Sequence, residues 1–235
     1  MMQLELKNIY KNFGDFNALK NISMSLHSGE IVGFLGPNGS GKSTTLKILA
    51  SIYQPSAGTI YWQGKSVDTN QLTYKKNIGF LAETNPLYDH MFVCEYLLFV
   101  AQVHQIEYAE DKISDYLKKT SLQAEYKKKV GILSKGNRQR LGLIAALLPQ
   151  PKILLLDEPI NGLDPNQIVD LRQLIKKEAT NKIILFSSHL LAEVKHLCQR
   201  IIIINKGEIV YETGINSSIE ESDLADIFKE KTLEV

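Results

Sequence analysis

The stretch Glu30-Ile31-Val32-Gly33-Phe34-Leu35-Gly36-Pro37-Asn38-Gly39-Ser40-Gly41-Lys42-Ser43-Thr44 joins an apolar run to a glycine-rich loop. The apolar run predicts a buried strand, and Leu46, Leu49 and Tyr53 recur at helical spacing after the loop. A Gly-x-x-x-x-Gly-Lys-Ser loop between a buried strand and a helix is the arrangement that binds nucleotide phosphates. The stretch therefore predicts a phosphate-binding loop followed by a helix.

The residue types of this loop assign a role to each of its parts. Its glycines allow backbone N–H groups to converge on a β-phosphate, and the N-terminus of the following helix adds partial positive charge. We expect Lys42 to neutralise the β- and γ-phosphate oxygens and the hydroxyl of Ser43 to ligate Mg²⁺. The predicted cofactors are a nucleoside triphosphate and Mg²⁺.

Two adjacent carboxylates follow a second apolar run, Ile153–Leu156. Successive residues of a strand point to opposite faces, so we expect Asp157 and Glu158 to do different work. Asp157 is expected to hold Mg²⁺ through a water, and Glu158 to face the γ-phosphate and polarise the attacking water. Pro159 comes directly afterwards and favours a turn over a helix that the two carboxylates would cap.

A histidine follows a third apolar run, Ile183–Phe186, after two serines. Ligands bind at the carboxyl ends of parallel strands, so His189 is expected at the same end of the sheet as the phosphate-binding loop. There it would hydrogen-bond the γ-phosphate and hold Glu158 and the water in line.

A Ser-x-Gly turn, Ser134 to Gly136, opens a helix far from the phosphate-binding loop. It has the chemistry of a second phosphate clamp. Within one molecule this clamp has no nucleotide of its own. The turn therefore predicts that two molecules face each other and share two ATP molecules.

The remaining pattern predicts an α/β fold built on a mostly parallel sheet. Alternating segments near the N-terminus predict an antiparallel β subdomain, whereas the uninterrupted apolar runs predict parallel strands buried on both faces. A helical pattern over about 85–148 predicts an inserted α-helical subdomain, and a short C-terminal helix is expected over about 219–231. We expect residues 1–235 to form one P-loop NTPase domain.

The composition narrows the classes of partner. The formal net charge is +1, which offers no field for nucleic acid. The two cysteines, Cys94 and Cys198, lack metal or redox spacing and are expected to be reduced packing thiols. Since no run approaches eighteen apolar residues and no signal peptide is evident, we expect a membrane-spanning part, if needed, to be another polypeptide.

These motifs, in this order, resemble the nucleotide-binding subunits of ATP-binding cassette (ABC) transporters over the chain up to about Gly214. The resemblance matches Gly36–Thr44 to the Walker A loop and Ile153–Glu158 to the Walker B strand with its catalytic glutamate. It matches Asn161–Asp164 to the D-loop and His189 to the switch histidine. The wording of the motifs is nearest to the gliding-motility-associated and ABC-2-type exporter subunits.

The resemblance adds an adenine-stacking aromatic at Phe13 and puts Glu83 at the position of the Q-loop glutamine, where a carboxylate would approach Mg²⁺ or its waters. The signature loop, usually Leu-Ser-Gly-Gly-Gln, reads Leu133–Asn137 with Lys135 as a departure, and it retains Ser134 and Gly136. The expected nucleotide-binding set is Phe13, Gly36, Pro37, Asn38, Gly39, Ser40, Gly41, Lys42, Ser43, Thr44, Ser134 and Gly136; the catalytic set is Glu158, His189 and Lys42; the metal set is Ser43, Asp157 and Glu83.

The resemblance also implies partners and a location. It implies an ATPase with a second ATP-binding subunit, a homodimer being expected, around two Mg-ATP. It further implies integral membrane permease subunits and a peripheral position on the cytoplasmic face of the cell membrane. A coupling helix of the membrane partner is expected near the apolar cluster that starts at Met91.

Two other functions compete with this one. A soluble ABC ATPase, for example in iron–sulfur assembly, would use the same residues without transport. A GTP switch is suggested by Asn205–Glu208, which resembles a guanine-reading string, but it has Glu for Asp and the chain has no Asp-x-x-Gly. A hairpin turn between Ile201–Ile204 and Ile209–Tyr211 explains this string better.

Overall fold

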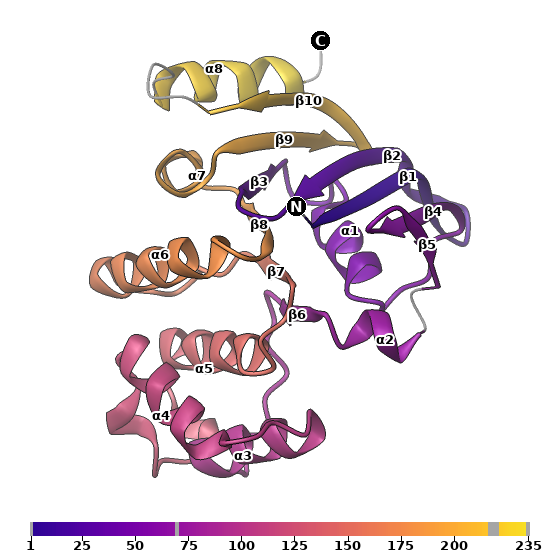
Figure 1. Cartoon of the computed structure of the whole chain (residues 1–235). Helices are drawn as coiled ribbons and strands as arrows, with labels where there is room; N and C mark the ends of the chain where they lie inside the picture. Colours follow the sequence, from indigo (N-terminus) through magenta and orange to yellow (C-terminus); the bar gives the residue numbers. More distant parts are fainter. Residues whose placement is uncertain (1, 69–70, 216–220, 234–235) are drawn as a thin grey trace.

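The computed structural model describes residues 2–68, 71–215 and 221–233, and its strands form two sheets (Figure 1). The smaller sheet is antiparallel, in the order β2-β1-β4-β5. Its strands are β1 (Gln3–Phe13), β2 (Phe16–His27), β4 (Ala57–Trp62) and β5 (Lys65–Val67). The expected antiparallel β subdomain is confirmed in these strands.

The larger sheet has the order β10-β9-β3-β8-β7-β6. All its neighbouring strands are parallel except β9 and β10, which form an antiparallel hairpin at one edge. The hairpin confirms the turn expected at Asn205–Glu208. The strands are β3 (Ile31–Leu35), β6 (Ile78–Leu81), β7 (Ile153–Asp157), β8 (Ile183–Ser188), β9 (Arg200–Asn205) and β10 (Glu208–Gly214).

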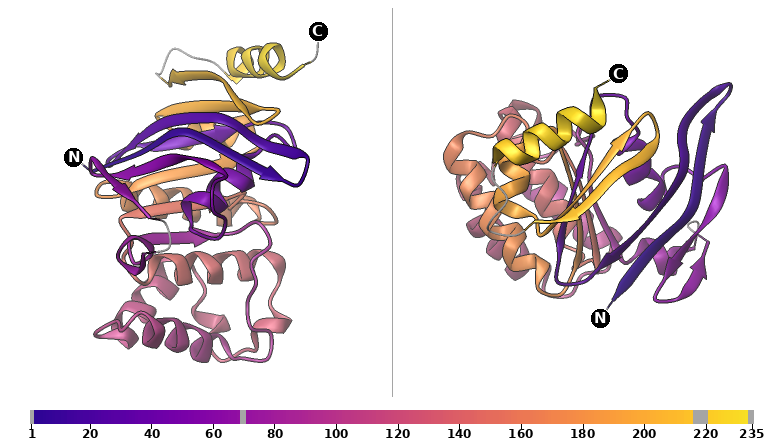
Figure 2. Two further views of the ribbon diagram at one scale, coloured as in Figure 1. Left: turned by 90° about the vertical axis from the view of Figure 1, so that its right-hand side faces the viewer. Right: turned by 90° about the horizontal axis from the view of Figure 1, so that it is seen from above.

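Three central strands are buried along their whole length, as their apolar sequences predict. Every residue of β3, β7 and β8 is buried, because both faces of the sheet are covered. Helix α1 (Lys42–Leu49) lies between the two sheets, while α6 (Pro165–Ala179) and α7 (Leu191–Leu197) cover the other face (Figures 1 and 2). Beside β6, α2 (Leu72–Lys75) is a single turn.

Two helix boundaries show what local sequence determines. Helix α6 begins at Pro165, since Asp164 accepts a hydrogen bond from the backbone N–H of Gln167 at 3.0 Å and proline suits the first helical position. Helix α1 ends at Leu49 and does not continue to Tyr53, although the apolar spacing predicted that it would. Ser51 adopts a φ of +61°, a left-handed conformation that ends the helix.

The segment 85–148 contains helices α3 (Val93–Val103), α4 (Ala109–Lys119) and α5 (Lys135–Leu147), with short 3₁₀ turns at Gln123–Glu125 and Val130–Ile132. Its standing as an inserted subdomain of one 1–235 domain remains a prediction. The expected start of the C-terminal helix at 219 lies outside the described residues. From Glu221 to Thr232 the chain forms α8.

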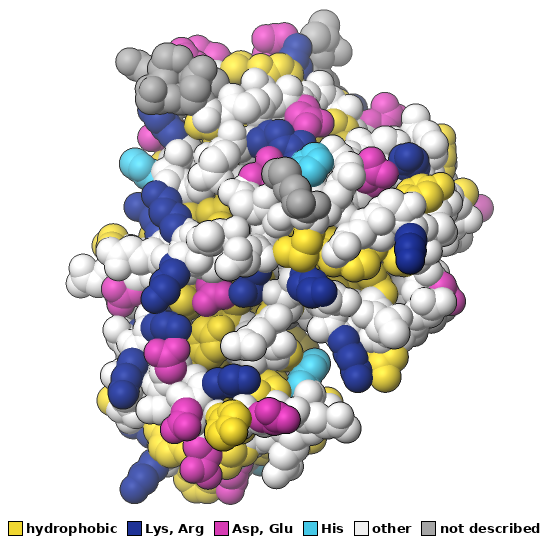
Figure 3. Space-filling model, in the orientation of Figure 1, with side chains coloured by type: hydrophobic (Ala, Val, Ile, Leu, Met, Phe, Trp, Pro, Cys, Tyr) yellow, Lys and Arg dark blue, Asp and Glu magenta, His cyan; other side chains and the backbone are white. Residues whose placement is uncertain are grey.

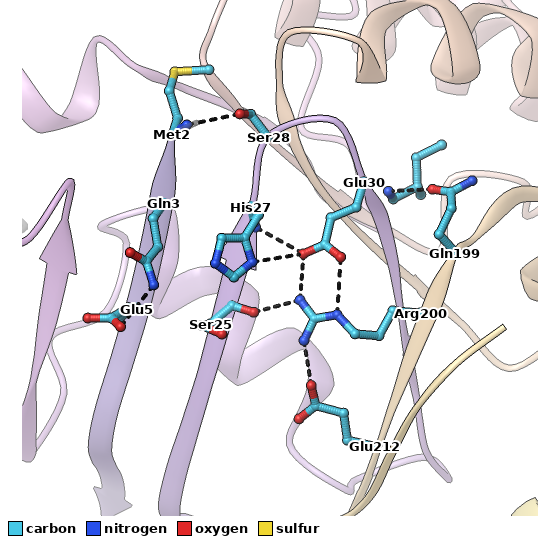
Figure 4. A network of polar contacts seen from close by, with 11 residues as sticks. Met2, Gln3, Glu5, Ser25, His27, Ser28, Glu30, Gln199, Arg200 and Glu212 are labelled. Carbon is cyan, nitrogen blue, oxygen red and sulfur yellow. Dashed lines mark hydrogen bonds and ion pairs between the residues drawn. The ribbon is translucent and has the colours of Figure 1, made fainter.

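An ion-pair network joins the two sheets (Figure 4). The guanidinium of Arg200, at the start of β9, donates to both carboxylate oxygens of Glu30, to Glu212, and to the carbonyl oxygen of Ser25 on β2 at 2.6 Å. Burial opposes ionisation of Glu30, but the hydrogen bond and charge of Arg200 outweigh it, so the pKa of Glu30 is lowered. The network fixes the antiparallel sheet against the parallel one.

The outer surface mixes charges of both signs. On the face shown in Figure 3, Lys and Arg side chains are interspersed with Asp and Glu. Among the described helices, none combines the length and apolar character that crossing a bilayer requires.

Candidate functional site

The phosphate-binding loop needs its glycines for two separate reasons. A Cβ on Gly36 would lie 2.2 Å from the carbonyl oxygen of Ile204, so β9 leaves no room for a side chain there. Gly39 and Gly41 have φ angles of +79° and +112°, which L-residues rarely adopt. These constraints fix the curved backbone of the loop from Gly36 to Lys42, the first residue of α1, which we call the arch.

Lys42 points back into this arch. Its ammonium group donates hydrogen bonds to the carbonyl oxygens of Gly36, at 2.7 Å, and Pro37, at 3.2 Å. Burial lowers the pKa of Lys42, although the charges of Glu158, Asp157 and Glu83 oppose this effect. A cation surrounded by a phosphate-sized loop is suited to neutralise anionic oxygens.

Asp157 is buried at the end of β7. Its carboxylate accepts a hydrogen bond at 2.7 Å from the hydroxyl of Ser187, on the neighbouring strand β8. The same hydroxyl accepts one at 3.1 Å from the backbone N–H of Glu158. Ser187 therefore holds both carboxylate residues in position from the adjacent strand.

Glu158 lies just beyond β7, with a φ of +49°. This left-handed conformation is costly for a residue with a side chain and is found mostly where the surroundings enforce it. Here the carbonyl oxygen of Glu158 accepts hydrogen bonds from Asn161 N–H, at 3.2 Å, and from the Gln139 side chain, at 3.4 Å. Glu158 therefore lies in a turn outside β7, where the alternation of side chains along a strand no longer applies, and the separate roles of the two carboxylates stay a prediction.

His189, which follows β8, contacts Glu158, which follows the neighbouring strand β7. Its Nδ1 lies 2.8 Å from Oε2 of Glu158, and the imidazole is half exposed while the carboxylate is buried. Burial raises the pKa of Glu158, and the charges of His189 and Lys42 only partly offset it. A carboxylate with a raised pKa next to a phosphate-binding loop is suited to accept a proton.

The raised pKa of Glu158 makes a stability prediction. The nucleotide-free folded state holds the proton of Glu158 more tightly than the unfolded chain does, so the stability linked to that proton is lost as the pH rises through the folded pKa. Glu158→Gln removes this loss. We therefore expect the melting temperature of the variant to gain on that of the wild type as the pH rises from below 4.5, the ordinary pKa of the group, to neutrality.

Glu30→Gln is the matched control for this experiment. The pKa of Glu30 is lowered, so its stabilisation is present above the unfolded pKa and is lost as the pH falls. The melting temperature of Glu30→Gln should therefore fall relative to that of the wild type over the same rise in pH. Parallel curves for Glu158→Gln and the wild type would contradict the raised pKa.

A cavity of about 690 Å³ lies over the arch. It brings together Lys42 from α1, Glu83 after β6, Glu158 after β7 and His189 after β8, residues far apart in the sequence. Its size is that of a site for a nucleotide-sized ligand. The predicted residues that line it are Phe13, Gly36, Pro37, Asn38, Gly39, Gly41, Lys42, Ser43, Thr44, Glu83, Glu158 and His189.

Four further residues line the cavity that the motifs did not assign to it: Phe16, Ala18, Asn161 and Phe228. Asn161 belongs to the segment matched to the D-loop, so the sequence offered a signal for it. Phe16 lies opposite Phe13 in the β1–β2 hairpin, and this pairing depends on the register of the two strands. Phe228 comes from α8, and no sequence motif marks it.

Phe13 has an exposed ring at the mouth of the cavity. The ring is 44% exposed, and its edge-to-face contact with Tyr53 has a centroid distance of 5.4 Å. The ammonium of Lys11 lies 5.0 Å from the ring centroid. An aromatic ring held in this way offers a free face for a planar base.

The oxygen donors near the cavity suit Mg²⁺. Ser43 supplies a hydroxyl, Asp157 a carboxylate, and Glu83 a second carboxylate on the cavity wall. Mg²⁺ is usually held by one or two carboxylates together with waters and substrate phosphates, not by a full protein cage. Among the described residues, no group of three or more His, Cys, Asp or Glu that could hold a metal is present.

Ser134 and Gly136 do not line this cavity. Ser134 is exposed and caps α5, where its hydroxyl accepts a hydrogen bond at 3.2 Å from the N–H of Asn137. Gly136 is buried against the Asn161–Asp164 segment, since a Cβ there would lie 2.9 Å from the carbonyl oxygen of Gly162. The turn places the capped N-terminus of α5 next to that segment, with Ser134 exposed and Gly136 buried.

Fold and site together define a P-loop nucleoside triphosphatase with a second, outward-facing Ser-x-Gly turn. The family model described as ABC transporter matches residues 19–161. The chain belongs to the ABC transporter family. It is an ATP-binding subunit, and it hydrolyses ATP to drive transport.

Similar proteins cover almost the whole chain. An uncharacterized ABC transporter ATP-binding protein, YdbJ of Bacillus subtilis (strain 168), is 37% identical over 224 residues, 94% of this chain and 72% of that protein. The lantibiotic transport ATP-binding protein SrtF of Streptococcus pyogenes is 34% identical over 231 residues, 98% of this chain and 97% of that protein. The dimeric structure of MJ0796, a bacterial ABC transporter cassette, superposes with a TM-score of 0.82 at 28% identity, covering 91% of this chain and 99% of that one.

Proposed function

We propose that two copies of this chain bind two Mg-ATP head to tail, close, hydrolyse ATP and reopen. The observation that carries this proposal is the position of Ser134 and Gly136, which have the chemistry of a phosphate clamp but lie outside the cavity of their own chain. A second copy gives the clamp a ligand. The dimeric cassette of MJ0796 supports the same arrangement.

Each part of the cavity takes one part of the substrate. Phe13 stacks on adenine, the loop from Gly36 to Thr44 holds the phosphates through its N–H groups, and Lys42 neutralises the β- and γ-oxygens. Ser134 and Gly136 of the second copy bind the γ-phosphate. Since ADP lacks this phosphate, the two copies bind each other more tightly around ATP than around ADP.

Mg²⁺ is assigned to Ser43, Asp157 and Glu83. Ser43 supplies the hydroxyl ligand, Asp157 acts through a water, and Glu83 approaches the ion or its waters from the cavity wall. The bound ion neutralises charge on the phosphates during transfer.

Hydrolysis depends on Glu158 and His189. Glu158 orients a water for attack on the γ-phosphorus and accepts its proton, as the bond to the ADP oxygen breaks. His189, 2.8 Å from the carboxylate, keeps Glu158 in place and hydrogen-bonds the γ-phosphate. The raised pKa of Glu158 fits a proton acceptor.

The transport partners are integral membrane permease subunits, and this chain binds them on the cytoplasmic face of the cell membrane. Exposed aromatic side chains between β6 and α3 suit this contact: Tyr88 is 54% exposed and Phe92 38%. Tyr88 also packs edge-to-face on Phe99 of α3, at a centroid distance of 5.6 Å. Membership of the ABC-2-type exporter group is supported by the name of SrtF, a lantibiotic transport protein.

Ser134→Arg tests the shared site. The substitution puts a large guanidinium group in place of an exposed hydroxyl outside the cavity, so the ATP affinity of the isolated subunit is expected to change less than about twofold. The kcat for ATP hydrolysis should fall about 10²-fold, because the two copies can no longer close around the nucleotide. Nucleotide binding is measured by calorimetry and phosphate release by a coupled assay.

Ser114→Arg, on the exposed face of α4, introduces the same charge away from the proposed interface and should retain activity. Full activity of Ser134→Arg would refute the shared site. The membrane partners are tested by affinity capture from membranes, which should recover an integral membrane protein with the chain. Capture of the chain without any integral membrane protein would contradict the proposed permease contact.

A further inference from the structure

The C-terminal helix α8 lies beside the β9–β10 hairpin (Figure 2), and one of its residues, Phe228, lines the nucleotide cavity. Leu224 anchors it in the core, with 1% of its surface exposed. At its other end, the side chain of Asn205 donates to the carbonyl oxygens of Lys231, at 3.4 Å, and Thr232, at 3.5 Å. Since Asn205 is the last residue of β9, the end of α8 lies at the same edge of the sheet as the phosphate-binding loop.

The turn after β9 continues this connection to the loop itself. The N–H of Gly207 donates to the carbonyl oxygen of Ser40 at 2.9 Å, and the carbonyl oxygen of Gly207 accepts from the N–H of Lys20 at 2.7 Å. A Cβ on Gly207 would lie 2.7 Å from the carbonyl oxygen of Ala18, which also lines the cavity. Helix α8 is thus supported by the same turn that supports the phosphate-binding loop.

Phe228 lies one turn before the end of α8, and its ring lines the cavity. Its carbonyl oxygen accepts a hydrogen bond at 2.6 Å from the hydroxyl of Thr232, which stabilises the last turn of the helix. Phe228 is partly buried: it packs against the core cluster and also lines the cavity.

We propose that Phe228 packs against bound ATP, which makes α8 a wall of the nucleotide site. The inference rests on the proposed binding of ATP in this cavity. A ring on the cavity wall loses contact with water when a nucleotide fills the space, and burial of its surface stabilises the complex. Helix α8 consequently contributes to ATP affinity although none of the nucleotide motifs lies on it.

A single tryptophan tests the contact directly. The chain has one tryptophan, Trp62, so Phe228→Trp in a Trp62→Phe background places the only reporter on α8. We expect its emission to change saturably with Mg-ATP, at the concentrations that half-saturate binding measured independently. Emission that stays constant at saturating Mg-ATP would overturn the proposal.

Phe228→Ala tests the energetic contribution. Loss of an aromatic contact of ordinary strength should raise the Kd for ATP about 3- to 10-fold. Lys229→Ala changes the exposed neighbouring residue of the same helix and should leave the Kd unchanged. A Kd for Phe228→Ala equal to that of the wild type would refute the contact.

Melting curves separate this effect from loss of structure. Without nucleotide, Phe228→Ala should melt below Lys229→Ala because it loses contacts with the core. The upward shift induced by ATP, measured from each variant's own nucleotide-free melting temperature, should be smaller only for Phe228→Ala. Lys42→Ala distinguishes failure of the proposed Phe228 contact from failure of the proposed ATP site itself. If Lys42→Ala binds ATP normally, the cavity assignment fails; if only the Phe228 variants behave as wild type, the role of α8 alone fails.

Discussion

Glutamine in place of Glu158 is expected to lower kcat for ATP hydrolysis about 10²- to 10⁴-fold while leaving ATP binding intact. The amide keeps the size of the side chain but cannot accept the proton of the attacking water. The hydrogen bonds of Glu158 with Ser187, Gln139 and Asn161 use its backbone atoms, so the turn at φ +49° should persist in the variant. Single-turnover phosphate release measures the chemical step.

The same variant should accumulate as an ATP-bound dimer. Because hydrolysis no longer removes the γ-phosphate, Mg-ATP keeps the two subunits closed, and light scattering should report a doubled mass. Adding Ser134→Arg should return the mass to that of one subunit. Glu107→Gln makes the same chemical change at an exposed site and should behave as wild type. Wild-type turnover by Glu158→Gln would remove Glu158 from catalysis.

Replacing Lys42 by alanine should weaken ATP binding by about 10²-fold or more, because truncating one partner of a buried charge pair costs about 2–5 kcal/mol. The ammonium group already lies 2.7 Å from the carbonyl oxygen of Gly36, so it reaches the phosphates without reorganisation of the loop. Burial lowers the pKa of Lys42, which means that removing its charge should not unfold the protein. Calorimetric titration with Mg-ATP and a melting curve measure both effects.

Lys65→Ala, at an exposed position on β5, is the control for loss of a single positive charge. It should bind ATP as the wild type does. An unchanged ATP affinity in Lys42→Ala would show that the arch over Gly36–Lys42 is not the phosphate-binding site.

Much of the fold could be predicted because the deciding signals are local. The apolar run before the loop becomes β3, Asp164 and Pro165 start α6, and Gly39 and Gly41 of the loop adopt backbone angles that only glycine tolerates easily. Each signal depends on residues within one turn or one strand. The sequence did not predict that α1 ends at Leu49, because serine, unlike glycine or asparagine, is not a residue type that indicates a left-handed backbone at position 51.

The parts of the site that the sequence could not supply depend on tertiary contacts. The left-handed backbone of Glu158 is enforced by Ser187 and Gln139, which are 29 and 19 residues away in the chain. Phe228 reaches the cavity only because α8 returns to the edge of the sheet beside Asn205. No periodicity or motif encodes such a return.

The attachment of β2 to the β9–β10 hairpin has a further consequence. Ser25 is bound by Arg200 near one end of β2, and the N–H of Lys20 is bound by Gly207 farther along the strand. The β1–β2 hairpin that carries Phe13 belongs to one sheet, whereas Gly36 follows a strand of the other. These two contacts hold the sheet that carries Phe13 against the sheet that carries the phosphate-binding loop. A substitution of Arg200, which does not line the cavity, is therefore expected to change the distance between the base-binding and phosphate-binding parts of the site.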